Sequence, residues 1–530
     1  MNLENMFKPL ASFFAKRAAG TACEACALQK RSFDFSILIP AIVAGWLGFL
    51  KFDASTLLDL DEYYHMAITR IILSGHFPHS LPFKFSMLGS LFADKDLLLH
   101  IITVPFLAIC ADPVIAAKCT TVFMDAVLVL TLCAIMGRYA GKTAAAVLAL
   151  GLISSPLFTI YSLYLRPATL AILFTVSGLH FMVQKKKWPL FIVSALFALS
   201  HVSAFTLLFF ACLCEGLRWL YTREFNVDTV AYTLLGLVAG CIVHPNFPVN
   251  IATIYVNAIL SPMYARSGEI HSFGSELFSG STSFILSANL LAFGFFFFAF
   301  WLAAAIRPRI SLQTVFFTLS AQIYMVMAMG ATRFWHQALP MILFAASAFW
   351  GDISELQLSP AQGRIKKTVI WLWLAMTLIM VAITAHDIGP TLRNRIKFVD
   401  PVADAAQWLH GKLPPGTVVY HALWSDAHPL LLLAPEYTYM TALDPVYMMY
   451  VRPKTAVVYD KLGEGSISNP HDAIINLFQS HYAFILKATG LYKEIKDMPG
   501  FEVMYENPGV VIFQLTDLPD RKLAHSGSKK

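Results

Sequence analysis

Residues 58–65 read Leu-Asp-Leu-Asp-Glu-Tyr-Tyr-His, and this acidic cluster comes shortly after an apolar run at residues 35–50. The run is barely long enough to cross a bilayer as a helix. Acidic side chains beside a membrane span are costly to hold there and are candidates for function by default. Carboxylates in such a place can bind a hard cation or act as a catalytic base.

Composition places the cluster in a polytopic membrane protein. The chain has 530 residues, of which 57% are hydrophobic and only 14% charged, with a mean hydropathy of +0.61. A soluble protein of this size could not bury so much apolar surface. Repeated apolar runs predict about eleven spans, at residues 35–51, 114–136, 143–160, 168–184, 188–202, 203–219, 228–244, 284–306, 310–329, 334–351 and 368–386.

The distribution of Lys and Arg predicts the orientation. Before residue 387, seventeen of these residues fall on one side of the predicted spans and six on the other. The side richer in Lys and Arg is normally cytoplasmic. We therefore expect an inner-membrane protein with a cytoplasmic tail at 1–34, outer loops at 52–113 and 245–283, and an extracytoplasmic domain at 387–530. The tail lacks the pattern of a cleavable signal peptide, so the first span is interpreted as a signal anchor.

The last 140 or so residues have the composition of a soluble mixed α/β domain. An amphipathic helix is expected at 400–409 and strands at 418–421 and 483–486. Residues 501–505 and 510–515 flank a turn and predict a hairpin. There is no Gly-rich phosphate loop and no feature of nucleic-acid binding. In the first outer loop, residues 97–111 predict an apolar helix, carrying His100, that lies along the membrane interface.

The residues of the first outer loop resemble a known family. Asp-Glu-Tyr-Tyr-His-Met at 61–66, followed by Arg70 and Phe77-Pro78, is similar to the first-loop motif of archaeal oligosaccharyltransferase catalytic subunits, members of the GT-C superfamily of membrane glycosyltransferases. The stretch 138–156 and Arg333-Phe334 are looser matches. The resemblance implies a GT-C-like helical membrane domain at 35–386. It also implies transfer, with inversion, of a sugar or glycan from a polyprenyl-(pyro)phosphate donor to an extracytoplasmic glycan, lipid or protein acceptor, with Mg²⁺ or Mn²⁺ as cofactor.

Two departures from the family pattern bear on metal use and on the acceptor. The second outer loop of oligosaccharyltransferases carries acidic metal ligands, whereas here it reads Tyr-Leu-Arg-Pro at 164–167. That sequence instead resembles GT-C enzymes that use lipid-phosphate mannose. The acceptor motif of the soluble domain has paired Trp followed by Asp, and here only Trp424 and Asp426 remain. The resemblance implies that these two contact the acceptor, and a structural corner of the domain is the alternative. Recognition of an Asn-X-Ser/Thr sequon is therefore left open.

These patterns predict a set of site residues. Asp61 is expected to be the central carboxylate, as base or metal ligand, although it could also cap the following helix. Glu62 is expected to assist it, and Glu276 matches the flexible-loop Glu of the family. Metal ligands would be Asp61 and Glu276, with Asp94 and Asp96 replacing the missing acids. The donor phosphate would contact Arg333, Arg166 and His65, because guanidinium groups bind phosphate in a bidentate manner; snorkelling to lipid headgroups is the alternative for both Arg.

Three other functions stay open at this point. A form that depends on a polyprenyl monophosphate sugar would use Asp61 as a base and would need no metal. A transporter of lipid-linked sugars would show broken helices and inverted repeats, and the sequence shows no sign of either. A non-catalytic partner subunit would carry the acids as remnants.

Overall fold

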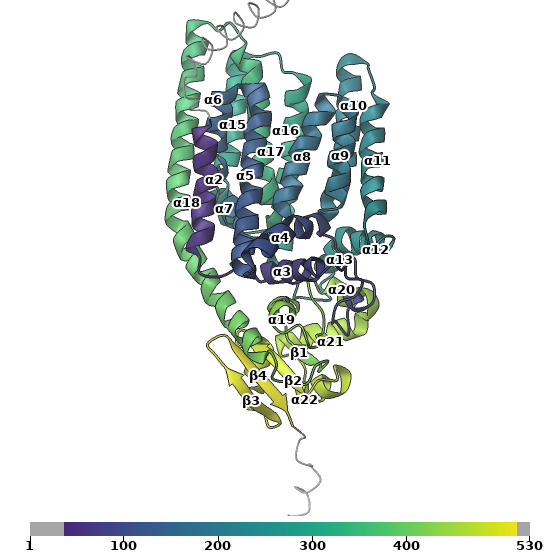
Figure 1. Cartoon of the computed structure of the whole chain (residues 1–530). Coiled ribbons are helices and arrows are strands. Elements are labelled where there is room, and N and C mark those ends of the chain that lie inside the picture. The colour runs from purple at the N-terminus through teal and green to yellow at the C-terminus, as the bar shows by residue number, and fades with distance from the viewer. Residues whose placement is uncertain (1–36, 517–530) are drawn as a thin grey trace, which may run out of the picture.

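The computed structural model describes residues 37–516. The predicted tail at 1–34 lies outside the described residues. Apolar helices run side by side in one bundle (Figure 1). They are α2 (Leu38–Asp53), α5 (Pro113–Ala140), α8 (Ala168–Val183), α9 (Lys187–Ala198), α10 (Thr206–Thr222), α11 (Val227–Val243), α15 (Leu290–Ile306), α16 (Leu312–Gly330), α17 (Trp335–Ser354) and α18 (Pro360–Leu409).

The number of membrane spans is not settled by these helices. By length and composition, four of the described helices can cross a membrane, and six can if each of two bent pairs is one span. The predicted count of about eleven is therefore not confirmed. Several apolar helices, among them α8 and α11, are shorter than eighteen residues. At 1.5 Å per residue they reach only about 25 Å, less than a typical hydrocarbon core of about 30 Å.

Two helices of the bundle are broken, which corrects the expectation of unbroken spans. Residues 142–154 and α7 (Pro156–Ser162) meet at 86°, and α14 (Thr282–Ala288) and α15 meet at 72°. At the first break Ser155 caps α7, whose first residue is Pro156. The Ser155 hydroxyl also donates to the carbonyl of Ala288 at 3.1 Å, so the two breaks touch.

Short helices cover one end of the bundle and separate it from the C-terminal domain (Figure 1). They are α3 (Leu60–Leu73), α4 (Leu97–Cys110), α12 (Val249–Tyr255) and α13 (Ser261–Ser267). The predicted helix at 97–111 is confirmed as α4. We call this end of the bundle the domain end.

The C-terminal domain is mixed α/β, as predicted. α18 continues without a break from the bundle into this domain (Figure 1). A four-stranded sheet has the order β1 (Val419–His421), β2 (Tyr482–Leu486), β4 (Val510–Leu515), β3 (Phe501–Glu506), with β1 and β2 parallel and the other pairs antiparallel. The predicted strands and hairpin are confirmed. The domain also contains the helices α19 (Ala427–Leu433), α20 (Val446–Val451), α21 (Pro453–Glu464) and α23 (Gly490–Ile495).

Backbone hydrogen bonds join the first loop to this domain. The amide of Lys84 donates to the carbonyl of Tyr439, and the amide of Tyr439 donates to the carbonyl of Pro82, both at 2.8 Å. The domain is therefore docked against the domain end of the bundle.

Candidate functional site

Arg166 gathers three carboxylates at the domain end. It lies between α7 and α8, and its guanidinium contacts Asp59 at 2.5 Å, Asp61 at 2.7 Å and Glu276 at 3.0 Å. Asp59 precedes α3 and makes no capping hydrogen bond, because its carboxylate faces Arg166 instead. Asp61 lies in the first turn of α3 and, like Glu276, remains partly exposed.

Asp61 has a second partner in the C-terminal domain. Oδ1 of Asp61 lies 3.1 Å from Nδ1 of His428, a buried residue of α19. The backbone amide of Leu443 donates to Nε2 of His428 at 3.0 Å. Since Nε2 accepts, a neutral His428 ring carries its proton on Nδ1, the nitrogen that lies beside Asp61. Nothing in the sequence singled out His428, which follows Trp424 and Asp426 in the chain.

The two acids Asp59 and Asp61 have pKa shifts of opposite direction. Burial raises the pKa of Asp59 to about 6, with Arg166 opposing the rise and Asp61 adding to it. Burial also acts against ionisation of Asp61, but Arg166 and His428 outweigh it and hold its pKa far below the usual range. These neighbours favour the ionised form of Asp61, whereas Asp59 has a pKa of about 6.

Glu62 belongs to a different, fully buried pair. Its carboxylate receives the Lys51 ammonium at 2.7 Å and 3.0 Å, and the same ammonium donates to the carbonyl of Leu163 at 2.6 Å. Both side chains are inaccessible to solvent. Glu62 thus ties α3 to the last turn of α2 and to the loop that carries Arg166, and its predicted catalytic role stays a prediction.

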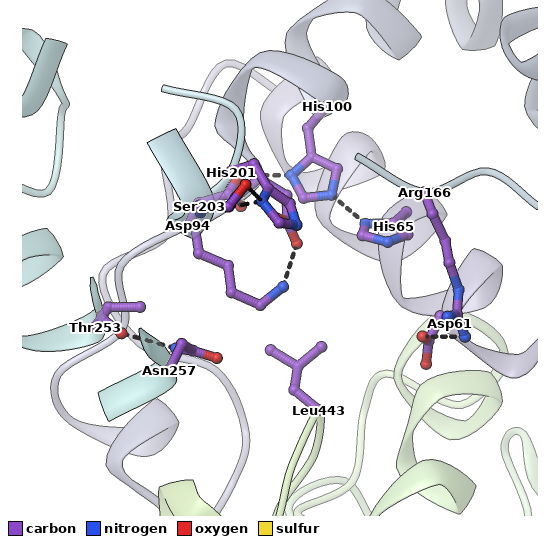
Figure 2. A network of polar contacts seen from close by, with 12 residues as sticks. Asp61, His65, Asp94, His100, Arg166, His201, Ser203, Thr253, Asn257 and Leu443 are labelled. Atoms are coloured by element: carbon purple, nitrogen blue, oxygen red, sulfur yellow. Dashed lines mark hydrogen bonds and ion pairs between the residues drawn. The ribbon is translucent and has the colours of Figure 1, made fainter. Parts of the chain in front are cut away.

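The other acids of the first loop are also paired. Asp94 contacts Nδ1 of His100 at 2.6 Å, and Asp96 contacts Lys95 at 2.6 Å. Nε2 of His100 lies 2.9 Å from Nδ1 of His65. Figure 2 shows His65 between His100 and the Asp61–Arg166 pair. Two imidazole rings therefore connect Asp94 to the site.

The loop that carries Glu276 is held from two sides. On the bundle side, the amide of Thr332 donates to the carbonyl of Phe278 at 3.0 Å. On the domain side, the Trp424 indole donates to the carbonyl of Ser272 at 2.6 Å. Arg333 follows Thr332, is half-buried, and has no ion-pair partner among residues 37–516. Burial lowers its pKa, and Glu276 partly offsets this.

Asp426 occupies a buried corner of the domain. Its carboxylate accepts the backbone amide of Leu423 at 3.1 Å, and burial raises its pKa well above the usual range. The Trp424 indole is hydrogen-bonded to Ser272, so Trp424 and Asp426 both have structural partners. Their predicted contact with the acceptor stays a prediction.

The four predicted metal ligands do not converge. Asp61 and Glu276 enclose a guanidinium in the place that a divalent cation would need, and Asp94 and Asp96 are committed to His100 and Lys95. Within residues 37–516, the one group of three side chains close enough to hold an ion lies elsewhere, with ligand atoms within 4.8 Å of one another: His271, Asp460 and Glu464. The residues around Asp61 therefore do not fit a metal.

Comparisons with known proteins identify the fold. No protein-family model and no curated protein sequence matches the chain. Among solved structures, ArnT from Cupriavidus metallidurans bound to undecaprenyl phosphate matches with a TM-score of 0.56 and 14% identity, over 90% of this chain and 97% of that chain. The archaeal oligosaccharyltransferase AglB from Archaeoglobus fulgidus, in complex with an inhibitory peptide and a dolichol-phosphate, matches with a TM-score of 0.59 and 12% identity, over 92% of this chain and 75% of that chain. Its apo form gives a TM-score of 0.60, with 12% identity.

At 12–14% sequence identity, the similarity to these solved structures establishes the fold alone. Both proteins are GT-C membrane glycosyltransferases, so the fold predicted from residues 61–66 is confirmed. The helical bundle with a docked C-terminal domain is the architecture that this chain has in common with them.

Proposed function

We propose that this chain is an integral membrane glycosyltransferase that moves a sugar or glycan from a polyprenyl-(pyro)phosphate carrier to an acceptor at the domain end of the bundle. The observation that carries the proposal is the position of Asp61. This ionised carboxylate lies between Arg166 of the bundle and His428 of the domain, on a fold otherwise seen in lipid-linked sugar transferases.

Asp61 is suited to stabilise the charge that develops on the sugar during transfer. Glycosyl transfer passes through a state in which positive charge develops at the anomeric carbon. A fixed carboxylate beside that carbon stabilises the charge, and the benefit is larger in a partly dehydrated site than in water. Glu276 lies across Arg166 from Asp61 and would orient the acceptor.

Arg333 is suited to bind the leaving phosphate of the donor. A leaving polyprenyl phosphate must be stabilised by cationic donors, and a guanidinium can contact two phosphate oxygens at once. Arg166 is already shared among three carboxylates, whereas Arg333 is free of ion pairs within the described residues. We therefore assign the donor phosphate chiefly to Arg333, with Arg166 organising the acids.

The form of the enzyme that this arrangement supports is the metal-independent one. The guanidinium of Arg166 supplies the positive charge between Asp59, Asp61 and Glu276 that a cation supplies in other sites. The surplus of Lys and Arg at the opposite end supports an extracytoplasmic site in an inner membrane. The division into a tail, a membrane domain at 35–386 and an exported domain at 387–530 is part of the same proposal.

The test is transfer of labelled sugar by purified protein from extracted lipid-linked donors, with and without EDTA. We expect Asp61→Asn to lower the rate by about two orders of magnitude, the scale of a lost electrostatic contact in an active site, and EDTA to leave the rate unchanged. Asp53→Asn is the matched control, since Asp53 is exposed at the end of α2 and should have no effect. Full activity of Asp61→Asn would overturn the assignment, and loss in EDTA would favour the metal-dependent, oligosaccharyltransferase-like form.

Transport of a lipid-linked sugar is a second candidate, and the broken helices favour it. Discontinuous helices that meet within a bundle are common in transporter binding sites, and here Ser155 joins the two breaks. In reconstituted vesicles, movement of a labelled lipid-linked sugar across the bilayer without transfer would support transport. Transfer without such movement would exclude it.

A further inference from the structure

Asp61 is poorly placed to accept a proton from an acceptor group. Its Oδ2 is 2.7 Å from the Arg166 guanidinium, and its Oδ1 faces Nδ1 of His428 at 3.1 Å. With a guanidinium at one oxygen and an imidazole nitrogen 3.1 Å from the other, the carboxylate supplies negative charge rather than a free base. The proton of the acceptor needs another destination.

Three buried side chains form a row that ends beside Asp61. Asp94 contacts Nδ1 of His100 at 2.6 Å, and Nε2 of His100 contacts Nδ1 of His65 at 2.9 Å. Each of the three is at most 3% exposed. Asp61 and His65 are four residues apart on α3, so they lie on the same face of that helix, and Figure 2 shows His65 between His100 and the Asp61–Arg166 pair.

The direction of the hydrogen bonds follows from the acid at the start of the row. An ionised Asp94 can only accept, so His100 donates through Nδ1 and keeps a lone pair on Nε2. His65 must then donate through Nδ1, which leaves the lone pair on its Nε2. No described residue donates a hydrogen bond to that atom.

Other contacts fix the row in place. The carboxylate of Asp94 also accepts the amide of Asp96 at 3.1 Å, and its backbone carbonyl accepts from His244 at 2.8 Å. The Tyr64 ring packs edge-on against both imidazoles, at centroid distances of 5.5 Å and 6.2 Å. The rings of His65 and His100 therefore have little freedom to turn.

Burial and nearby positive charge keep His65 neutral. Burial, together with His100 and Lys95, lowers its pKa well below the usual range, with Asp61 acting in the opposite direction and Arg166 in the same one. A bound donor phosphate would add negative charge and raise that pKa again. His65 would thus gain basicity when the substrate is present.

We propose that Nε2 of His65 takes the proton of the acceptor, and that His100 and Asp94 are positioning residues that present its lone pair; this rests on the proposed transferase function. The acceptor O–H or N–H gives its proton to Nε2 as the new bond to the anomeric carbon forms. The bond from that carbon to the phosphate breaks, and the phosphate leaves with the electron pair. The proton on Nδ1 of His65 passes to His100, where the positive charge lies against Asp94.

The first arm of the test measures transfer by His65→Asn. An Asn amide can replace the Nδ1–H donor to His100 but has no lone pair where Nε2 was, so the fold should survive. We expect kcat to fall by about 10²-fold, the lower range for a general base, with little change in KM. His65→Ala should be partly rescued by added imidazole. The control is His180→Asn, because His180 is equally buried but bonds to Tyr139. A folded His65→Asn with wild-type kcat would overturn the proposal.

The second arm needs no substrate and separates this proposal from the proposed function. Diethylpyrocarbonate attacks imidazole lone pairs, so we expect His65 to be labelled several-fold faster than His100 by mass spectrometry. Asp94→Asn can donate to His100 and would reverse the row, placing a proton on Nε2 of His65 and slowing its labelling several-fold. Equal labelling of both rings, or labelling unchanged by Asp94→Asn, would overturn the proposal. Selective labelling in a protein that transfers no sugar would instead refute the proposed function.

Discussion

At the scale of single residues, Asp59 gives the site a dependence on pH. Burial raises its pKa to about 6, above the usual value near 3.9. Below about pH 6 the carboxyl becomes protonated and its ion pair with Arg166 is lost. Transfer should therefore decline as the pH falls through about 6, and Asp59→Asn should remove this step from the profile of rate against pH.

The raised pKa of Asp59 also makes the stability of the fold depend on pH, but in the opposite direction from transfer. The folded state binds the Asp59 proton more tightly than the unfolded state does, so this residue's contribution to stability decreases as the pH rises from about 4 to about 6. The melting temperature of Asp59→Asn relative to wild type should rise over that window. A constant difference across the window would contradict the assignment.

Arg166 offers a direct test of the metal question. Arg166→Ala should leave Asp59, Asp61 and Glu276 converging on an empty space with three oxygen-bearing groups, which suits a divalent cation. We expect millimolar Mn²⁺ to raise the melting temperature of this variant by a few degrees, through preferential binding to the folded state, and to leave wild type unchanged. Stabilisation of wild type to the same extent would show that a metal site already exists.

At the scale of elements, the pair Lys51–Glu62 joins α2 to α3. Both side chains are fully buried, and removing one partner leaves an uncompensated charge that costs about 3–5 kcal/mol. Lys51→Met should therefore lower the melting temperature strongly. The double variant Lys51→Met/Glu62→Leu should recover most of the loss, as measured by thermal unfolding in detergent. A double variant as unstable as the single one would mean that the Leu163 contact carries the effect.

At the scale of the whole molecule, the site exists because the domain is docked on the bundle. Asp460 of α21 accepts the amides of His271 and Ser272 at 2.8 Å and 3.0 Å, and so holds the loop of Glu276 against the domain. Asp460→Asn should weaken both bonds and speed cleavage by trypsin after the exposed Arg266 several-fold. Asp497→Asn, at an exposed position, is the control and should cleave like wild type.

The sequence by itself determined the class of fold and the main acidic element. Residues 61–66 predicted the GT-C fold, which the comparisons confirm. Alternating apolar residues near the C-terminus predicted the strands. The motif and the alternation are both local signals, so they do not depend on distant packing. Asp61, Arg166 and Glu276 were also singled out, each by its own short pattern.

Only the tertiary structure decided how these residues are combined. Arg166 is more than one hundred residues from both Asp59 and Glu276, and no local pattern shows that one guanidinium joins them. His428, the breaks at Ser155 and Asn289, and the row from Asp94 to His65 likewise depend on which elements pack together. Side-chain partners across such distances are set by the docking of helices and domain, and the packing of the whole chain turned a list of acidic residues into one site.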